Sequence, residues 1–289
     1  MSSIVVTGAT GHLGGLTVEA LLARGVDPAT ITATGRNPER LAALGELGVR
    51  TAVADLGDPT SLEEAFAGAD KVLLVSGSDV GQRVAQHRNA IDAAKEAGVA
   101  LLAYTSAPYA TTTTLLLAAE HKATEELLAA SGVAHVVLRN SWYVENYTDQ
   151  LDTTLEHGVV LGSAGDGRVS GAPRVDFAEA AAAVLATDGH EGKVYELGGD
   201  PAFTLTELAA VIAEATGRPV TYQDVPPAAH LEVLLGAGLP APFAEILVDA
   251  DRAIAAGELA TDSGDLARLI GRPTTPLAEA VAAAVAARP

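Results

Sequence analysis

Short apolar runs alternate with longer amphipathic segments through the first half of the chain. The runs show little polar alternation, which is typical of parallel strands covered by helices on both faces. They predict strands at Ile4–Thr7, Ile31–Thr34, Val49–Ala54, Lys71–Val75, Leu101–Thr105 and His135–Leu138. The segments between them predict helices at Gly14–Ala23, Pro38–Leu44, Pro59–Ala67, Gly81–Ala97 and Leu116–Ala130. This order predicts an α/β fold of Rossmann type, a doubly wound parallel sheet with right-handed crossovers.

The pattern changes after Arg139, where an aromatic and amide stretch is followed by glycine-rich residues 156–173. Val175–Ala186 predicts a helix, and Lys193–Leu197 predicts a strand that returns to the sheet. Later segments predict helices at Leu205–Thr216, Ala228–Leu235, Phe243–Ala256 and Leu277–Ala287, with one more strand at Val220–Tyr222. We therefore expect a Rossmann domain over residues 1–150, to which residues about 175–200 return. Residues 151–289 are expected to form a smaller, mostly helical lobe over the carboxyl edge of the sheet.

Composition excludes several classes of function. The 289 residues include no cysteine, so disulfides, thiolate nucleophiles and cysteine metal sites are absent. The formal net charge of −19 favours neither a nucleic acid nor an anionic membrane as a partner. Apolar runs are interrupted well before the roughly 18 residues of a membrane span. With no basic leader before the first strand, we expect a cytoplasmic protein.

Three glycines follow the first predicted strand and precede the first helix. Gly8 permits a tight turn, Gly11 lets the backbone approach a diphosphate, and Gly14 lets the helix pack closely on the strand. A diphosphate would then accept hydrogen bonds from free N–H groups at the helix N-terminus. The candidate cofactor contacts in this segment are Gly8, Thr10, Gly11, His12, Leu13 and Gly14. The alternative is that these glycines only form a turn.

The end of the second strand addresses the choice of cofactor. An NAD enzyme usually has an acidic residue here, which binds the ribose 2′-hydroxyl. This chain has Thr34-Gly35-Arg36-Asn37, with no acid. Arg36 offers a planar, permanently charged group suited to a 2′-phosphate, so we predict NADPH. The alternative is an exposed arginine in a turn.

Other polar residues lie at strand ends on the same predicted edge, where ligands bind in open α/β sheets. Asp55 and Leu56 are candidates for the adenine end, and Ser76 with Gly77 for the cofactor path. Thr105 and Ser106 are candidates near the nicotinamide. Ser78 is better explained as a polar strand terminus.

The catalytic pair of classical short-chain dehydrogenases is missing. None of the six tyrosines has a lysine four residues further on, although Lys122 or His121 could contact the ribose. Reduction of a simple ketone needs a positioned acid. Reduction of a quinone gives an anion whose conjugate acid is phenolic, with a pKa near ~10, so water can protonate it. No zinc-protease or hydrolase nucleophile motif occurs, and we predict no metal site.

Several longer segments carry a family resemblance. They are residues 6–11, 81–83, 86–89, 103–106, 138–147, 155–158, 165–167, 190–197 and 271–275, with Arg139-Asn140-Ser141-Trp142-Tyr143-Val144-Glu145-Asn146-Tyr147 the most specific. On these residues the chain resembles the NmrA-like atypical short-chain dehydrogenases, especially the bacterial NADPH:quinone oxidoreductases that use neither zinc nor flavin. The resemblance implies NADPH as cofactor, a quinone beside the nicotinamide, and a monomer or homodimer.

The resemblance also implies site residues after the sixth strand. Asn140, Ser141, Trp142 and Tyr143 would line the nicotinamide end, and Tyr143 and Asn146 would face the substrate as catalytic residues. Ordinary packing is the alternative for Trp142, Tyr143 and Tyr147, and it is the better explanation for Trp142. Arg174 is a further cofactor candidate, although an ion pair with Asp176 would explain it as well.

The sequence leaves three candidate functions. The first is a quinone reductase that takes its hydride from NADPH and its proton from solvent. The second is a redox sensor that binds the dinucleotide and acts through a protein partner. The third is a sugar epimerase or ketone reductase, against which the missing tyrosine–lysine pair argues.

Overall fold

The structure is a computed structural model that describes residues 2–288. Within these residues the chain divides into two compact units. The first unit contains the described residues up to Ala107, with Ala119–Asn140 and Arg174–Tyr195. The second unit contains Pro108–Ala118, Ser141–Pro173 and the described residues from Glu196 onward.

The first unit is built around a central sheet. Its strands are β1 (Ile4–Val6), β2 (Ile31–Gly35), β3 (Arg50–Val53), β4 (Lys71–Leu74), β5 (Leu101–Ser106) and β6 (His135–Asn140), and β8 (Val194–Leu197) extends the sheet next to β6. The strand order is β3-β2-β1-β4-β5-β6-β8, and the strands from β1 to β6 pair in parallel. The order reverses beside β1, which is the switch point where doubly wound folds bind ligands. The predicted fold class is confirmed.

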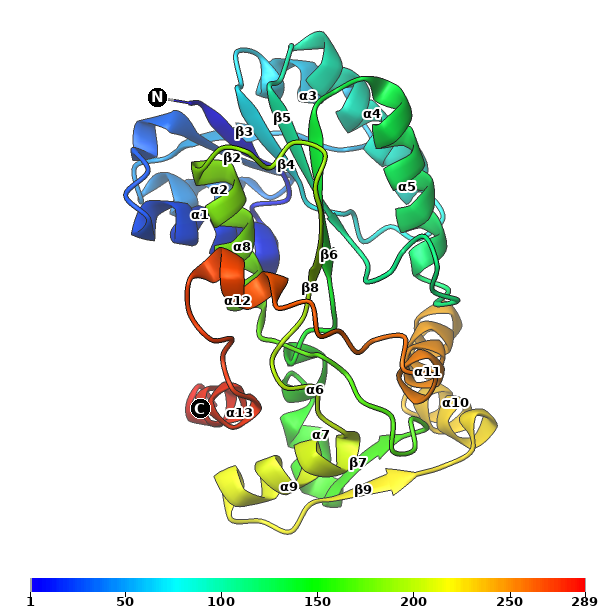
Figure 1. Cartoon of the computed structure of the whole chain (residues 1–289). Coiled ribbons are helices and arrows are strands. Elements are labelled where there is room, and N and C mark those ends of the chain that lie inside the picture. Colours follow the sequence, from blue (N-terminus) through cyan, green and yellow to red (C-terminus); the bar gives the residue numbers. More distant parts are fainter. Residues whose placement is uncertain (1, 289) are drawn as a thin grey trace. The chain divides into compact units, whose positions relative to one another are not determined.

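Helices cover both faces of this sheet (Figure 1). They are α1 (His12–Ala23), α2 (Pro38–Gly45), α3 (Pro59–Phe66), α4 (Arg83–Glu96), α5 (Ala118–Ser131) and α8 (Arg174–Ala186), with a short 3₁₀ turn at Pro28–Thr30. Helices α1 and α8 pack together on one face, and α3 packs against α4 on the other (Figure 1). Pro38 and Pro59 each stand in a first helical turn, where no N–H partner is needed.

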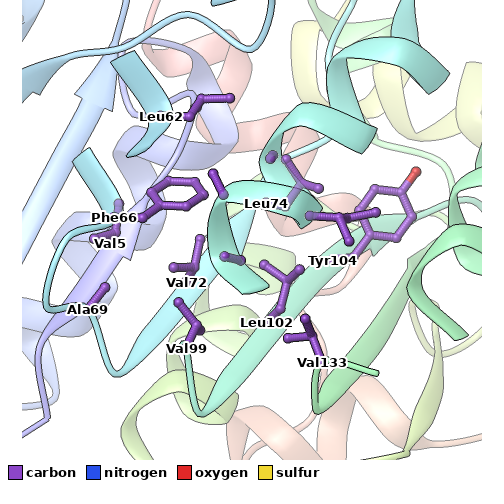
Figure 2. Packing of buried hydrophobic residues seen from close by; sticks show 14 of the residues in the cluster. Val5, Leu62, Phe66, Ala69, Val72, Leu74, Val99, Leu102, Tyr104 and Val133 are labelled. Carbon is purple, nitrogen blue, oxygen red and sulfur yellow. The ribbon is translucent and has the colours of Figure 1, made fainter. Parts of the chain in front are cut away.

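The core beneath α3, α4 and α5 is continuous and apolar. Figure 2 shows Phe66, Val72 and Leu74 packed between the helices and the strands, with Leu102 and Tyr104 further along the same layer. Burying one such large side chain contributes about 1.5–3 kcal/mol. This packing fixes the carboxyl ends of β4 and β5, which matter for the site below.

The second unit has a two-stranded sheet and several helices. Strands β7 (Val159–Gly162) and β9 (Thr221–Asp224) pair in parallel. Its helices are α6 (Glu145–Thr148), α7 (Leu151–His157), α9 (Leu205–Thr216), α10 (Pro227–Gly236), α11 (Ala241–Ala255), α12 (Asp265–Ile270) and α13 (Leu277–Ala286). Thr204 and Glu207 form a reciprocal capping box that begins α9. Among residues 2–288, no helix is long and apolar enough to cross a membrane.

Sequence reasoning missed several of these elements. Strand β7 lies inside the glycine-rich stretch for which no strand was expected, and α6, α7 and α12 were not predicted. Strand β3 was expected to be covered on both faces, yet it is an edge strand and Val53 is 64% exposed. That expectation was wrong, because three of the four residues of β3 are exposed and the fourth is half-buried.

Candidate functional site

The turn between β1 and α1 is shaped by its glycines. Gly8 has a φ of +61°, which a side chain would disfavour, and its carbonyl accepts a hydrogen bond from Gly11 N–H at 2.9 Å. A Cβ on Gly14 would lie 2.4 Å from the Gly8 oxygen, so only glycine permits this approach of helix to turn. No side chain caps α1, whose N-cap residue is Gly11. The first N–H groups of α1 therefore stay available to a phosphate, and the turn fits a dinucleotide diphosphate.

A cleft of about 310 Å³ opens beside this turn. The predicted cofactor residues that line it are Gly8, Thr10, Gly11, His12, Leu13, Gly14, Arg36, Asp55, Leu56, Ser76 and Gly77. Sequence reasoning missed other lining residues, namely Gly35, Ala54, Val75, Asp79 and Gln86, and it assigned no ligand role to Ser78. The structure therefore brings the turn together with the ends of β2, β3 and β4.

Two arginines border a more open hollow of about 510 Å³ next to the cleft. Arg36 follows β2 directly and its side chain is 63% exposed. Arg40, in the first turns of α2, donates a hydrogen bond from its guanidinium to the Thr10 carbonyl at 2.8 Å. Asn37 caps α2 by accepting from Arg40 N–H, which orients this helix N-terminus at the same hollow. Two guanidinium groups and the carboxyl group of Glu39 thus line this hollow in a chain that is acidic as a whole.

Helix α4 fixes the loop that follows β4. His87 Nε2 accepts a hydrogen bond from Gly77 N–H at 3.0 Å, and Arg83 Nε donates to the Gly77 carbonyl at 2.7 Å. Because Nε2 accepts, the ring proton is on Nδ1, which donates to Thr124 Oγ1 at 2.9 Å. Burial, with a smaller effect of Arg83, lowers the pKa of His87 to about 3 and keeps the ring neutral. Both polar groups of the Gly77 backbone are therefore held by buried side chains one helical turn apart.

Thr105 and Ser106 end strand β5, as predicted, but neither lines the cleft. Thr105 Oγ1 accepts a hydrogen bond from Ser76 N–H at 2.8 Å and so positions the end of β4. Ser106 Oγ donates to Glu125 Oε1 at 2.6 Å, within a buried ion pair between Glu125 and Arg139. Lys122 is exposed on α5 and does not line the cleft either.

A buried tyrosine near this edge is unsuited to proton transfer. The hydroxyl of Tyr104 lies 2.8 Å from His121 Nδ1, and the Tyr104 side chain is fully buried. Burial raises the pKa of Tyr104 well above its usual range and lowers the pKa of His121 to about 3. The raised pKa makes Tyr104 a weak proton donor, and neither Tyr104 nor His121 lines the cleft, so this pair does not replace the missing tyrosine–lysine pair.

The residues predicted for the nicotinamide and the substrate fall around the end of β6. Asn140 is the last residue of β6 in the first unit, where it is buried, and Arg174 begins α8 in the same unit. Ser141, Trp142, Tyr143 and Asn146 belong to the second unit. There Ser141 N–H donates to the Leu197 carbonyl at 2.8 Å, and Tyr143 forms a parallel bridge with Ala172. Asn146 lies half-buried on α6.

The second unit also contains a buried carboxyl group that sequence reasoning missed. Asp251 Oδ2 accepts a hydrogen bond from Ser163 N–H at 2.6 Å and lies 3.4 Å from His230 Nδ1. Burial raises the pKa of Asp251 to about 6, and burial lowers the pKa of His230. Within residues 2–288, no three His, Asp or Glu side chains gather as a metal site.

The strand, glycine turn and uncapped helix define the class: a dinucleotide-binding protein of Rossmann type. The profile of a family described as NAD(P)H-binding matches residues 8–188. An NmrA-like family domain-containing oxidoreductase from Aspergillus flavus is 31% identical over 96% of this chain and 93% of its own length. The chain belongs to the NmrA-like NAD(P)H-binding family, which confirms the predicted resemblance.

Two further relatives are close over the whole chain. Quinone oxidoreductase 2 from Escherichia coli is 49% identical over 96% of this chain and 97% of its own length. The crystal structure of the Escherichia coli NADPH-dependent quinone oxidoreductase in complex with NADPH matches with a TM-score of 0.94, covering 97% of this chain and 99% of that one. The Citrobacter sp. triphenylmethane reductase complexed with NADP(H) is 39% identical, with a TM-score of 0.92 and coverage of 98% and 100%.

Proposed function

We propose that this chain is an NADPH-dependent quinone reductase. The observation that carries the proposal is the glycine turn at the start of α1, which opens into a cleft beside Arg36. Its support from relatives is the 49% identity to quinone oxidoreductase 2 over nearly the full length. When bound, NADPH supplies a hydride to the quinone, and water supplies the one proton that completes the hydroquinone.

The first unit holds the cofactor in this proposal. The N–H groups of residues 12–14 bind the diphosphate, and Arg36 binds the 2′-phosphate as a charge-assisted donor. Asp55 and Leu56 flank the adenine end, while Ser76 and Gly77 line the path toward the nicotinamide. Thr105 contributes by holding Ser76 in place.

The residues that we assign to the nicotinamide and the quinone are Asn140, Ser141, Trp142, Arg174, Tyr143 and Asn146. Tyr143 and Asn146 contact the quinone in this proposal, and Asn140 through Trp142 line the nicotinamide. Ser106 and Lys122 are the weakest cofactor candidates, because Ser106 is committed to Glu125 and Lys122 is exposed. We further propose that residues 151–289 serve mainly the substrate, and that the working assembly is a monomer or homodimer.

The absence of a tyrosine–lysine pair from the sequence supports the substrate class. Among the tyrosines, Tyr104 is buried with a raised pKa, and none precedes a lysine at the required spacing. A ketone would leave an alkoxide that needs such an acid, whereas a hydroquinone anion is stable enough to take its proton from water. Positioning of the two reactants then supplies most of the rate enhancement.

The test is to follow NADPH absorbance with and without benzoquinone. A reductase consumes NADPH only when the quinone is present, whereas a redox sensor would bind NADPH and show no turnover. Tyr143→Ala should lower quinone turnover about tenfold or more while the Kd of NADPH stays the same, because the lost contact is to the substrate alone. Unchanged turnover in this variant would remove Tyr143 from the site, and no turnover in the parent protein would reject the reductase.

A further inference from the structure

An acidic side chain faces the predicted 2′-phosphate residue across the cleft. Asp79, in the loop between β4 and α4, places Oδ2 3.9 Å from Nη1 of Arg36. The two side chains are 39% and 63% exposed, and both line the same cleft. The end of β2 contains no acid, yet folding brings one to Arg36 from a segment more than forty residues later in the chain.

The position of Asp79 is fixed by neighbours on α4 rather than by Arg36. Gln86 Nε2 donates a hydrogen bond to Asp79 Oδ2 at 3.0 Å, and the Asp79 carbonyl accepts from Gln82 N–H at 3.0 Å. Gly77, two residues before Asp79, is held by His87 and Arg83. The Gln86 amide is neutral and does not cancel the charge of the Asp79 carboxylate. The cleft therefore has a negative side chain, Asp79, beside the Arg36 guanidinium.

We propose that Asp79 is a specificity-determining residue that limits the preference for NADPH over NADH by competing with the 2′-phosphate for Arg36. The inference rests on the proposed function, in which Arg36 binds that phosphate. A phosphate monoester carries a charge of about −1.5 to −2 at neutral pH, so a carboxylate beside its binding site repels it. The neutral 2′-hydroxyl of NADH suffers no such repulsion and can donate a hydrogen bond to a carboxylate.

The test uses two small probes that differ only in the phosphate concerned: 2′,5′-ADP and 5′-AMP. Their Kd values are measured by calorimetry for the parent protein and Asp79→Asn at about 0.01 M ionic strength, where screening is weak. Asp79→Asn should tighten 2′,5′-ADP relative to 5′-AMP about two- to fivefold, the range for an exposed charge contact, and added salt should shrink the gain. Glu46→Gln, an exposed acid at the end of α2, makes the same change in net charge and should leave the ratio unchanged.

A double-mutant cycle with Arg36→Met separates the proposal for Asp79 from the assignment of Arg36 to the 2′-phosphate. If the parent protein prefers 2′,5′-ADP and Arg36→Met removes that preference, the cofactor assignment stands. The gain from Asp79→Asn should then shrink in the Arg36→Met background, because the competition for Arg36 is lost and only the direct repulsion remains. If Asp79→Asn leaves the ratio unchanged, or matches Glu46→Gln, the proposal for Asp79 is overturned while the cofactor assignment survives. If Arg36→Met leaves the preference intact, the assignment of Arg36 fails first.

Discussion

Individual residues determine how closely the first helix approaches the phosphate turn. We predict that Gly14→Ala weakens NADPH binding at least tenfold and lowers the free energy of unfolding by about 1–3 kcal/mol, as overpacking does. The new Cβ would meet backbone atoms of Gly8 and Ala9 at 2.4 to 2.8 Å, and backbone cannot move aside cheaply. Calorimetry with NADPH and thermal unfolding provide the two measurements.

Gly45→Ala is the matched control for that substitution. Its Cβ would meet Thr51 at an ordinary 3.7 Å, and it lies in the last turn of α2. Alanine there should be neutral or slightly stabilising, because glycine is the weaker helix former. Equal effects of the two substitutions would show that the close approach at Gly14 is unimportant.

Asp251 gives a residue-level prediction about pH. Its folded pKa of about 6 is raised above the ordinary 3.8, so between these values the folded state binds more protons than the unfolded state. The contribution of this group to stability therefore falls as pH rises from about 4 to 6. His230, whose pKa is lowered, contributes in the opposite direction below its ordinary value.

We predict that Asp251→Asn raises the unfolding temperature at pH 8 and that its advantage shrinks at pH 5. The amide oxygen still accepts from Ser163 N–H, while the buried charge is removed. A gain on the order of 2 kcal/mol corresponds to a few degrees in a chain of this size. Thermal unfolding of both proteins across this pH range is the measurement, and a difference that is constant with pH would contradict the assignment of the shift to Asp251.

The sequence predicted cleft residues correctly where the residues of a motif lie close together along the chain. Gly8, Gly11 and Gly14 lie within seven residues of one another, and Arg36 follows a strand directly, so their cleft positions could be inferred. Asp79 and Gln86 were missed because they become neighbours of Arg36 only through the pairing of β1 with β2 and β4. Ser106 was a reasonable candidate from its strand end, but Glu125 occupies its hydroxyl.

At the scale of elements, α4 acts as the support for the loop after β4. We predict that His87→Leu raises the KM for NADPH about fivefold, because Gly77 N–H loses its acceptor and a typical intramolecular hydrogen bond contributes about 0.5–1.5 kcal/mol. The KM for the quinone should stay the same. Steady-state kinetics with each substrate varied in turn make the measurement.

His87→Gln should restore much of the NADPH affinity. The glutamine amide oxygen can accept from Gly77 N–H while its NH₂ group donates to Thr124, as the histidine does now. If leucine and glutamine raise the KM for NADPH equally, or if both KM values rise together, the hydrogen bond to Gly77 is not what His87 contributes.

Long, periodic elements were predictable, and short ones were not. Helix α9 matches its predicted range because Thr204 begins it and Gly217 ends it, which are strong local signals. Helices α6 and α12 have four and six residues, too few for periodicity to register. Strand β7 has four residues in a glycine-rich stretch, and its order comes from pairing with β9, which lies some sixty residues further on.

At the scale of the whole molecule, an acidic chain binds an anionic cofactor. The net charge of −19 produces a field that opposes NADPH, so local donors must overcome it. Composition made this conflict visible, but the sequence alone did not show how it is resolved. The structure places Arg36 and Arg40 together beside the cleft, with the N-terminus of α1 at the same turn.

Salt therefore has two opposite effects on the affinity for NADPH. Added salt weakens the repulsion from the whole chain and also weakens the attraction by Arg36, which is largely exposed. We predict that Arg36→Met weakens NADPH binding about tenfold or more at 0.01 M ionic strength, as expected for loss of a charge-assisted bond. The loss of NADPH affinity caused by Arg36→Met should be smaller near 0.15 M. Salt weakens the attraction between Arg36 and the 2′-phosphate in the parent protein, whereas the variant has no such attraction to lose and keeps only the repulsion from the acidic chain. Calorimetric Kd values over this range, with NADH as the ligand lacking the phosphate, measure both terms. A penalty that grows with salt, or an equal penalty for NADH, would mean that Arg36 does not act as a local counterion to the 2′-phosphate.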